Sequence, residues 1–159
     1  MGNLRLDVVV DAPVDKVFAA FTDWTRQGEW MLGTRVETGA QDGIGEGGEL
    51  RAWTGAGPLG FWDTMRITEW DEPYRVTVEH TGNVVRGTGT MEVVALPGGR
   101  SRFIWSENLV PPLGALGRVG WRVLRPAFGW GVAKSLRDFA AWCEQYPGPE
   151  EPGAAPPVD

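Results

Sequence analysis

The chain has few of the residues that disulfides and metal centres need. Its 159 residues include one cysteine, Cys143, and one histidine, His80. A lone cysteine cannot form an internal disulfide, and these two ligands are too few for a zinc site of cysteine and histidine. An all-oxygen metal site stays open on count alone, but neither an EF-hand spacing nor a P-loop is present. We therefore expect no bound metal and no cofactor.

Basic residues and long apolar runs are also scarce. The chain has 15 basic and 21 acidic residues, for a net charge of −6. Because non-specific nucleic-acid binding relies on a basic face, we expect no nucleic-acid partner. The longest apolar-leaning stretch, residues 109–130, holds three prolines and three arginines, which predicts no stable membrane insertion. The N-terminal residues lack a basic region followed by an apolar run, so we expect a cytoplasmic protein.

Tryptophan and glycine are abundant instead, with nine and 23 residues. Tryptophan offers a large apolar surface and one hydrogen-bond donor. Many tryptophans can form an ordinary core, or they can line a cavity for a flat, hydrophobic ligand. The length suits one domain with a substantial core.

Alternation and helical periodicity predict the order strand, two short helices, six strands and a long helix. Residues 4–10 alternate as a first strand, a helix begins near residue 11, and a short one spans about residues 25–31. Short turns rich in glycine and proline join the later segments, which predicts an antiparallel meander. The six further strands are expected at residues 35–38, 49–54, 61–70, 74–81, 85–96 and 102–110.

The C-terminal region predicts a helix that covers the sheet. Apolar residues follow one another at spacings of three and four from Phe128 to Cys143, and Pro126 begins or kinks the helix. The preceding stretch, residues 111–130, is either the amphipathic start of that helix or a mobile lid that also touches membranes. We expect a domain over residues 1–146 and a disordered, Pro-rich acidic tail over residues 147–159.

Four sequence segments resemble one superfamily. They are VVVDAPVDKVFAAFTDW, RITEWDEPYRVTVEHTG, RGTGTMEVVALPGGRSRFIWSE and WGVAKSLRDFAAWCE. Over about residues 3–145 the chain resembles the START-like superfamily, and most of all the bacterial polyketide cyclase/dehydrase and lipid-transport family. The resemblance implies an α+β helix-grip fold, in which a curved antiparallel sheet of about seven strands wraps a long C-terminal helix. It also implies an internal cavity for a hydrophobic small molecule.

The more apolar face of each strand is expected to line that cavity. The candidates share an inward position on a strand or on the covering helix. They are Met65, Ile67, Val78, Met91, Phe103 and Trp105 from the strands, with Phe128, Val132 and Leu136 from the helix.

Three polar residues interrupt these inner faces: Asp63, His80 and Glu107. A two-residue turn at Asp71 and Glu72 would pair Trp70 with Pro73 and set Asp63 opposite His80, and a turn around Gly98 would set Gly89 opposite Glu107. In the catalytic hypothesis, Asp63 orients and charges His80 as a general acid/base, and Glu107 is a second proton-transfer group or a ligand anchor. Arg51 joins them only if its strand turns it inward.

A plainer interpretation also stays open for these groups. Asp63 and His80 would then form a solvated pair at a strand end, and Glu107 would pair with an arginine of the C-terminal region. Accordingly, the sequence leaves two functions open: a carrier or sequestering protein for a lipid or polyketide-like molecule, and a polyketide cyclase/dehydratase. We expect a monomer or a homodimer.

Overall fold

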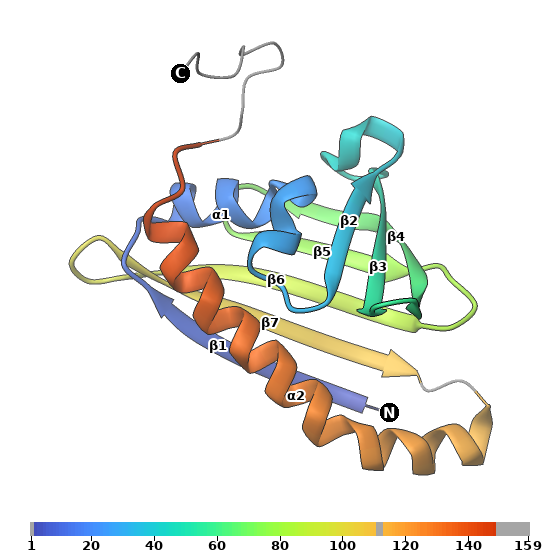
Figure 1. Cartoon of the computed structure of the whole chain (residues 1–159). Helices are drawn as coiled ribbons and strands as arrows, with labels where there is room; N and C mark the ends of the chain where they lie inside the picture. Colours follow the sequence, from blue (N-terminus) through green and yellow to red (C-terminus); the bar gives the residue numbers. More distant parts are fainter. Residues whose placement is uncertain (1, 111–112, 149–159) are drawn as a thin grey trace, which may run out of the picture.

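A seven-stranded antiparallel sheet curls beside one long helix in the computed structural model, which describes residues 2–110 and 113–148 (Figure 1). The strand order is β1-β7-β6-β5-β4-β3-β2, so the first and last strands in the chain are neighbours. The strands are β1 (Gly2–Val10), β2 (Thr34–Thr38), β3 (Glu49–Ala56), β4 (Leu59–Asp71), β5 (Arg75–His80), β6 (Arg86–Leu96) and β7 (Arg100–Val110). The helices are α1 (Val14–Thr22), the 3-10 helices η1 (Trp24–Glu29) and η2 (Ala40–Gly43), and α2 (Gly114–Glu144). The predicted α+β architecture is confirmed.

One face of the sheet is buried because apolar and polar residues alternate along its strands. In β5, Val76, Val78 and His80 are buried, while Arg75 and Glu79 are exposed. Against this face pack α1 and the C-terminal half of α2, as Figure 1 shows. Phe103 is a central contact, with ring centroids 5.1 Å from Phe21 of α1 and 4.6 Å from Phe139 of α2. The packed core therefore lies between α1, β7 and the end of α2.

The first half of α2 has little to pack against. It carries exposed Leu116, Val119 and Val123, and Pro126 is inside the helix rather than at its start. Figure 1 shows α2 changing direction along its length, as a proline within a helix favours. Within residues 2–110 and 113–148, no helix combines the length and the apolar character needed to cross a membrane.

The β4–β5 hairpin differs from the predicted register. Met65, not Asp63, lies opposite His80, and Asp71 pairs with Arg75 across a turn of three residues. A bulge between Ile67 and Glu69 adds one more residue on β4, so the two-residue turn expected from sequence was wrong. Tyr74, the last residue of this turn, is half exposed.

The β6–β7 hairpin has the predicted register. Met91 lies opposite Trp105, and Gly89 lies opposite Glu107. Of the expected tail, residues 149–159 lie outside the described residues, as do residues 111–112 of the expected lid segment. The domain boundary at residue 146 and the lid role stay predictions.

Candidate functional site

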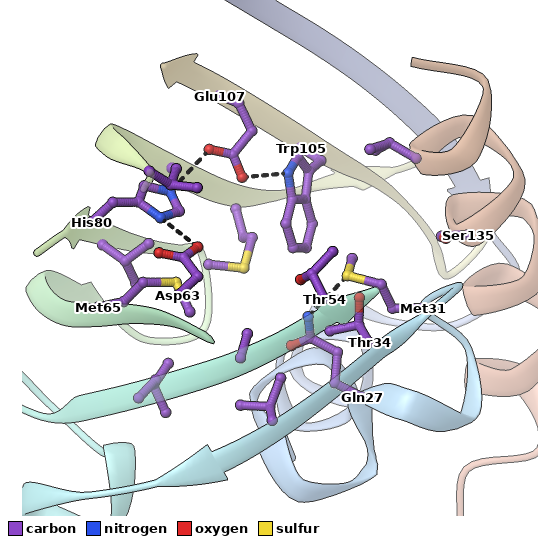
Figure 2. A pocket seen from close by; sticks show the side chains of 18 of the residues that line it. Gln27, Met31, Thr34, Thr54, Asp63, Met65, His80, Trp105, Glu107 and Ser135 are labelled. Carbon is purple, nitrogen blue, oxygen red and sulfur yellow. Dashed lines mark hydrogen bonds and ion pairs between the residues drawn. The ribbon is translucent and has the colours of Figure 1, made fainter. Parts of the chain in front are cut away.

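A cavity of about 230 Å³ lies between the sheet, η1 and α2 (Figure 2). Six of the nine predicted lining residues are on its wall: Met65, Val78, Met91, Trp105, Phe128 and Val132. The structure places Ile67, Phe103 and Leu136 in the packed core instead, each almost completely buried. They face inward as expected, but α1 fills the space in front of that part of the sheet.

Several lining residues were not predicted. Trp24, Gln27 and Met31 come from η1 and the turn after it, where no strand alternation exists to indicate an inner face. The others on β2 and β3 do alternate, so the period of two could have identified them. They are Thr34, Val36, Leu50, Ala52 and Thr54.

Asp63, His80 and Glu107 meet at one end of the cavity. The Nδ1 atom of His80 lies 2.8 Å from Oδ2 of Asp63, and its Nε2 atom lies 3.2 Å from Oε2 of Glu107. The indole N–H of Trp105 donates to Oε1 of Glu107 at 2.9 Å. Asp63, His80 and Glu107 are each 8% exposed, so the solvated strand-end interpretation does not describe them. Figure 2 shows the resulting chain of contacts, which we call the carboxylate–histidine cluster.

The two carboxylates hold a proton on His80. Burial alone would lower the pKa of the imidazole, but hydrogen bonds and charge attraction from Asp63 and Glu107 raise this pKa from 6.5 to about 9. At neutral pH the ring is therefore an imidazolium that donates one N–H to each carboxylate. An imidazolium cannot accept a proton, so proton acceptors in this cluster are the carboxylates.

Asp63 retains an unused acceptor. Its Oδ1 atom is buried and accepts no hydrogen bond from the residues that the structure describes. A buried acceptor without a partner costs about 1–3 kcal/mol. A ligand or water that donates to this carboxylate would remove that cost.

Gly89 makes room for the Glu107 carboxylate on the neighbouring strand. A Cβ atom at residue 89 would lie 3.0 and 3.1 Å from the two carboxylate oxygens of Glu107. An added methyl group would therefore require the Glu107 carboxylate to shift by a few tenths of an ångström.

We therefore expect Gly89→Ala to displace Glu107 and lower the pKa of His80 by about one unit, worth ~1.4 kcal/mol. Titration of the His80 ring by NMR measures this directly, since His80 is the only histidine. The control is Gly120→Ala, where an added Cβ would meet nothing within 4 Å. An unchanged His80 pKa in Gly89→Ala would contradict the tight fit.

The other end of the cavity carries neutral polar groups. Figure 2 shows Gln27, Thr34, Thr54 and Ser135 there, away from His80. The Ser135 hydroxyl donates to the carbonyl oxygen of Gly131 at 2.8 Å and accepts the Leu32 N–H at 3.0 Å. These internal hydrogen bonds leave Ser135 without the adjacent base that an activated nucleophile needs.

Arginine and lysine do not reach this cavity in the described part of the chain. Arg51 lies on the outer face of β3, where its Nε atom donates to Glu37 at 2.7 Å. Within residues 2–110 and 113–148, no three His, Cys, Asp or Glu residues are placed so that they could hold a metal ion. The cavity is thus an apolar chamber with one ionised end and one neutral polar end.

Comparisons with known proteins agree with this architecture. A family model described as polyketide cyclase / dehydrase and lipid transport matches residues 1–144. A crystal structure of a Thermus thermophilus protein is similar with a TM-score of 0.77 and 15% identity, covering 91% of this chain and 98% of that one. The Zhui aromatase/cyclase of Streptomyces sp. R1128 is similar with a TM-score of 0.75 and 16% identity, covering 91% and 94%.

A third similar structure is larger than this chain. It is the di-domain ARO/CYC BexL of the BE-7585A biosynthetic pathway, with a TM-score of 0.70 and 18% identity, covering 91% of this chain and 47% of that one. No protein with curated annotation matches significantly. At these identities the likeness establishes the helix-grip fold and not the chemistry.

Proposed function

Because the chain belongs to the polyketide cyclase / dehydrase and lipid transport family, we propose that it binds a hydrophobic small molecule in its internal cavity. The ligand is a lipid or an aromatic, polyketide-like metabolite, and the protein carries or sequesters it. A bacterial cytoplasmic location and a monomeric or homodimeric state are further parts of this proposal.

The observation that supports binding most strongly is the apolar wall of the cavity. Met65, Met91 and Trp105 of the sheet line it, together with Phe128 and Val132 of α2. Binding sites for small molecules are mostly apolar, with few polar groups that fix the orientation of the ligand. The carboxylate–histidine cluster and the neutral polar end provide such groups.

Filling the cavity is expected to weaken ligand binding without unfolding the protein. Val78 is buried on β5 and lines the cavity, so Val78→Phe directs a larger side chain into it. With a neutral naphthalene fluorophore such as 6-propionyl-2-dimethylaminonaphthalene, we expect a blue-shifted emission for the wild type. In Val78→Phe we expect binding at least ~10-fold weaker, about 1.4 kcal/mol.

The matched control is Glu79→Phe, an equally large side chain at the next residue on the exposed face of β5. This variant should bind the fluorophore as the wild type does. Thermal unfolding of both variants separates loss of the cavity from loss of the fold. Equal affinity in Val78→Phe and wild type would contradict binding inside the cavity.

The alternative function is a cyclase/dehydratase that acts on a polyketide chain. The observation that favours it is the buried cluster of the three catalytic candidates, Asp63, His80 and Glu107, on the cavity wall. With His80 charged, the histidine would act as the acid and Glu107 as the base. Asp63 would hold the imidazolium in place.

A synthetic poly-β-ketone thioester distinguishes the two functions. If the protein is an enzyme, the thioester would react faster with the protein than in buffer alone. Glu107→Gln would then reduce the catalysed rate by at least ~100-fold, which is within the usual contribution of a general base. A carrier would bind the thioester and leave its rate of consumption unchanged. Consumption that is equal in the wild type and in Glu107→Gln would contradict the enzyme.

A further inference from the structure

We propose that the polar end of the cavity selects hydrophobic ligands whose polar group donates hydrogen bonds, a protonated amine most strongly and a hydroxyl less so, and that it rejects carboxylates. This inference rests on the proposed function, because it concerns the occupant of the same cavity. The charge and the hydrogen-bonding capacity of the cavity wall restrict the chemical class of ligand that can bind.

The charge of the cavity wall is negative in either state of its histidine. Among the described residues, the acidic and basic side chains on the wall are Asp63, His80 and Glu107. Two carboxylates and an imidazolium sum to −1, and with a neutral imidazole the sum is −2. In a buried site such a charge repels an anion and attracts a cation more strongly than it would in water.

The donors at this end are already used. Both ring nitrogens of His80 contact carboxylates, at 2.8 and 3.2 Å, and the Trp105 N–H bonds to Glu107. A ligand carbonyl or carboxylate therefore finds no free donor among these groups. At this end of the cavity, it would bury its oxygens without hydrogen bonds.

Acceptors, in contrast, remain unused. Asp63 lines the cavity, and its Oδ1 atom accepts no hydrogen bond from the described residues, but this atom is itself buried and a ligand reaches it only if the side chain turns. A carboxylate oxygen accepts more than one hydrogen bond, so Glu107 also has capacity beyond its contacts with His80 and Trp105. An amine or hydroxyl on the ligand supplies the donor that this end lacks.

Charge separates an amine from a hydroxyl at this end. Both can donate to Glu107, whose carboxylate lies at the N–H edge of the Trp105 indole (Figure 2). The protonated amine is in addition attracted by the net negative charge of the wall. The neutral groups at the opposite end, Gln27 and Ser135 among them, supply no positive charge that could hold an anion.

Three probes with one carbon skeleton test this selectivity: 2-naphthylmethylamine, 2-naphthalenemethanol and 2-naphthoate. Isothermal titration calorimetry at pH 7 should give the tightest binding for the amine, weaker binding for the alcohol, and at least ~10-fold weaker binding for naphthoate than for the amine. Glu107→Gln removes one negative charge from the wall and should reduce the amine-to-naphthoate ratio at least ~5-fold. Asp63→Asn makes the same change of charge and provides a second test.

Glu79→Gln is the matched control, because it removes the same charge from the exposed face of β5. It should leave the amine-to-naphthoate ratio unchanged. Naphthoate binding as tightly as the amine would overturn the selectivity and leave the proposed function standing. Failure of all three probes to bind would overturn both. An equal change of the ratio in Glu107→Gln and Glu79→Gln would show surface attraction and overturn the assignment to the cavity.

Discussion

Replacing His80 with alanine is expected to lower the free energy of unfolding by about 3–5 kcal/mol at pH 7, as for removal of one partner of a buried ion pair. The substitution leaves Asp63 and Glu107 buried without the cation that separates them. It also removes the volume of the ring from a buried position. Urea unfolding at pH 7 measures the effect.

Two variants show whether the loss comes from unpaired charge. Adding Asp63→Asn and Glu107→Gln to His80→Ala removes both carboxylates and should recover much of the lost stability. Arg75→Ala breaks exposed ion pairs with Glu69 and Glu92, and it should cost at most ~1 kcal/mol. A loss below ~1 kcal/mol in His80→Ala would contradict a buried, charge-paired cluster.

Stability is also expected to fall as the pH rises from 6.5 to 9. The folded-state pKa of His80 is raised to about 9, whereas the unfolded chain has the ordinary value near 6.5. A raised pKa means that the folded state binds the proton more tightly than the unfolded state. The contribution of His80 to the free energy of unfolding is therefore fully present below pH 6.5, and it is lost as the pH rises from 6.5 through 9. The pKa difference corresponds to about 3 kcal/mol.

The pH window isolates His80 from two other groups. Burial raises the pKa of the Cys143 thiol to about 11, and burial with a hydrogen bond to Asp23 raises that of Tyr146 further. Both side chains are neutral when protonated, and their raised pKa values reduce stability mainly above pH 9. In His80→Gln, the decrease in the free energy of unfolding between pH 6.5 and 9 should therefore be absent. A His80 NMR titration midpoint near 6.5 would contradict the account.

The inner face of the sheet could be predicted from sequence because each strand alternates. This pattern identified Asp63, His80 and Glu107 as polar exceptions, and the regular β6–β7 hairpin placed Gly89 against Glu107. The β4–β5 register could not be predicted in the same way. A three-residue turn and a bulge shift the register, so that Met65 rather than Asp63 lies opposite His80. The alternation of apolar and polar residues reveals neither the turn length nor the bulge.

The extent of the cavity also depended on tertiary packing. Ile67, Phe103 and Leu136 have inward positions, but Phe18 and Phe21 of α1 belong to the same packed core and no ligand space remains there. Gln27 and Met31 reach the cavity because the η1 segment packs against β2, a contact without a local sequence pattern. The charge state of His80 could not be predicted from sequence because it depends on the contact with Glu107. This contact connects β5 with β7, two strands that are not neighbours in the sheet.

Methionine-methyl NMR tests most directly whether a ligand occupies the cavity. Three of the four methionines, Met31, Met65 and Met91, line it and come from separate elements. When 2-naphthalenemethanol is added to the wild type, we predict that these three methyl resonances shift together and that the shifts saturate at one probe per chain. In Val78→Phe, addition of the probe should leave the three resonances unchanged. Methyl resonances that do not shift at a saturating concentration of the probe would contradict the claim that this protein binds a hydrophobic molecule in its internal cavity.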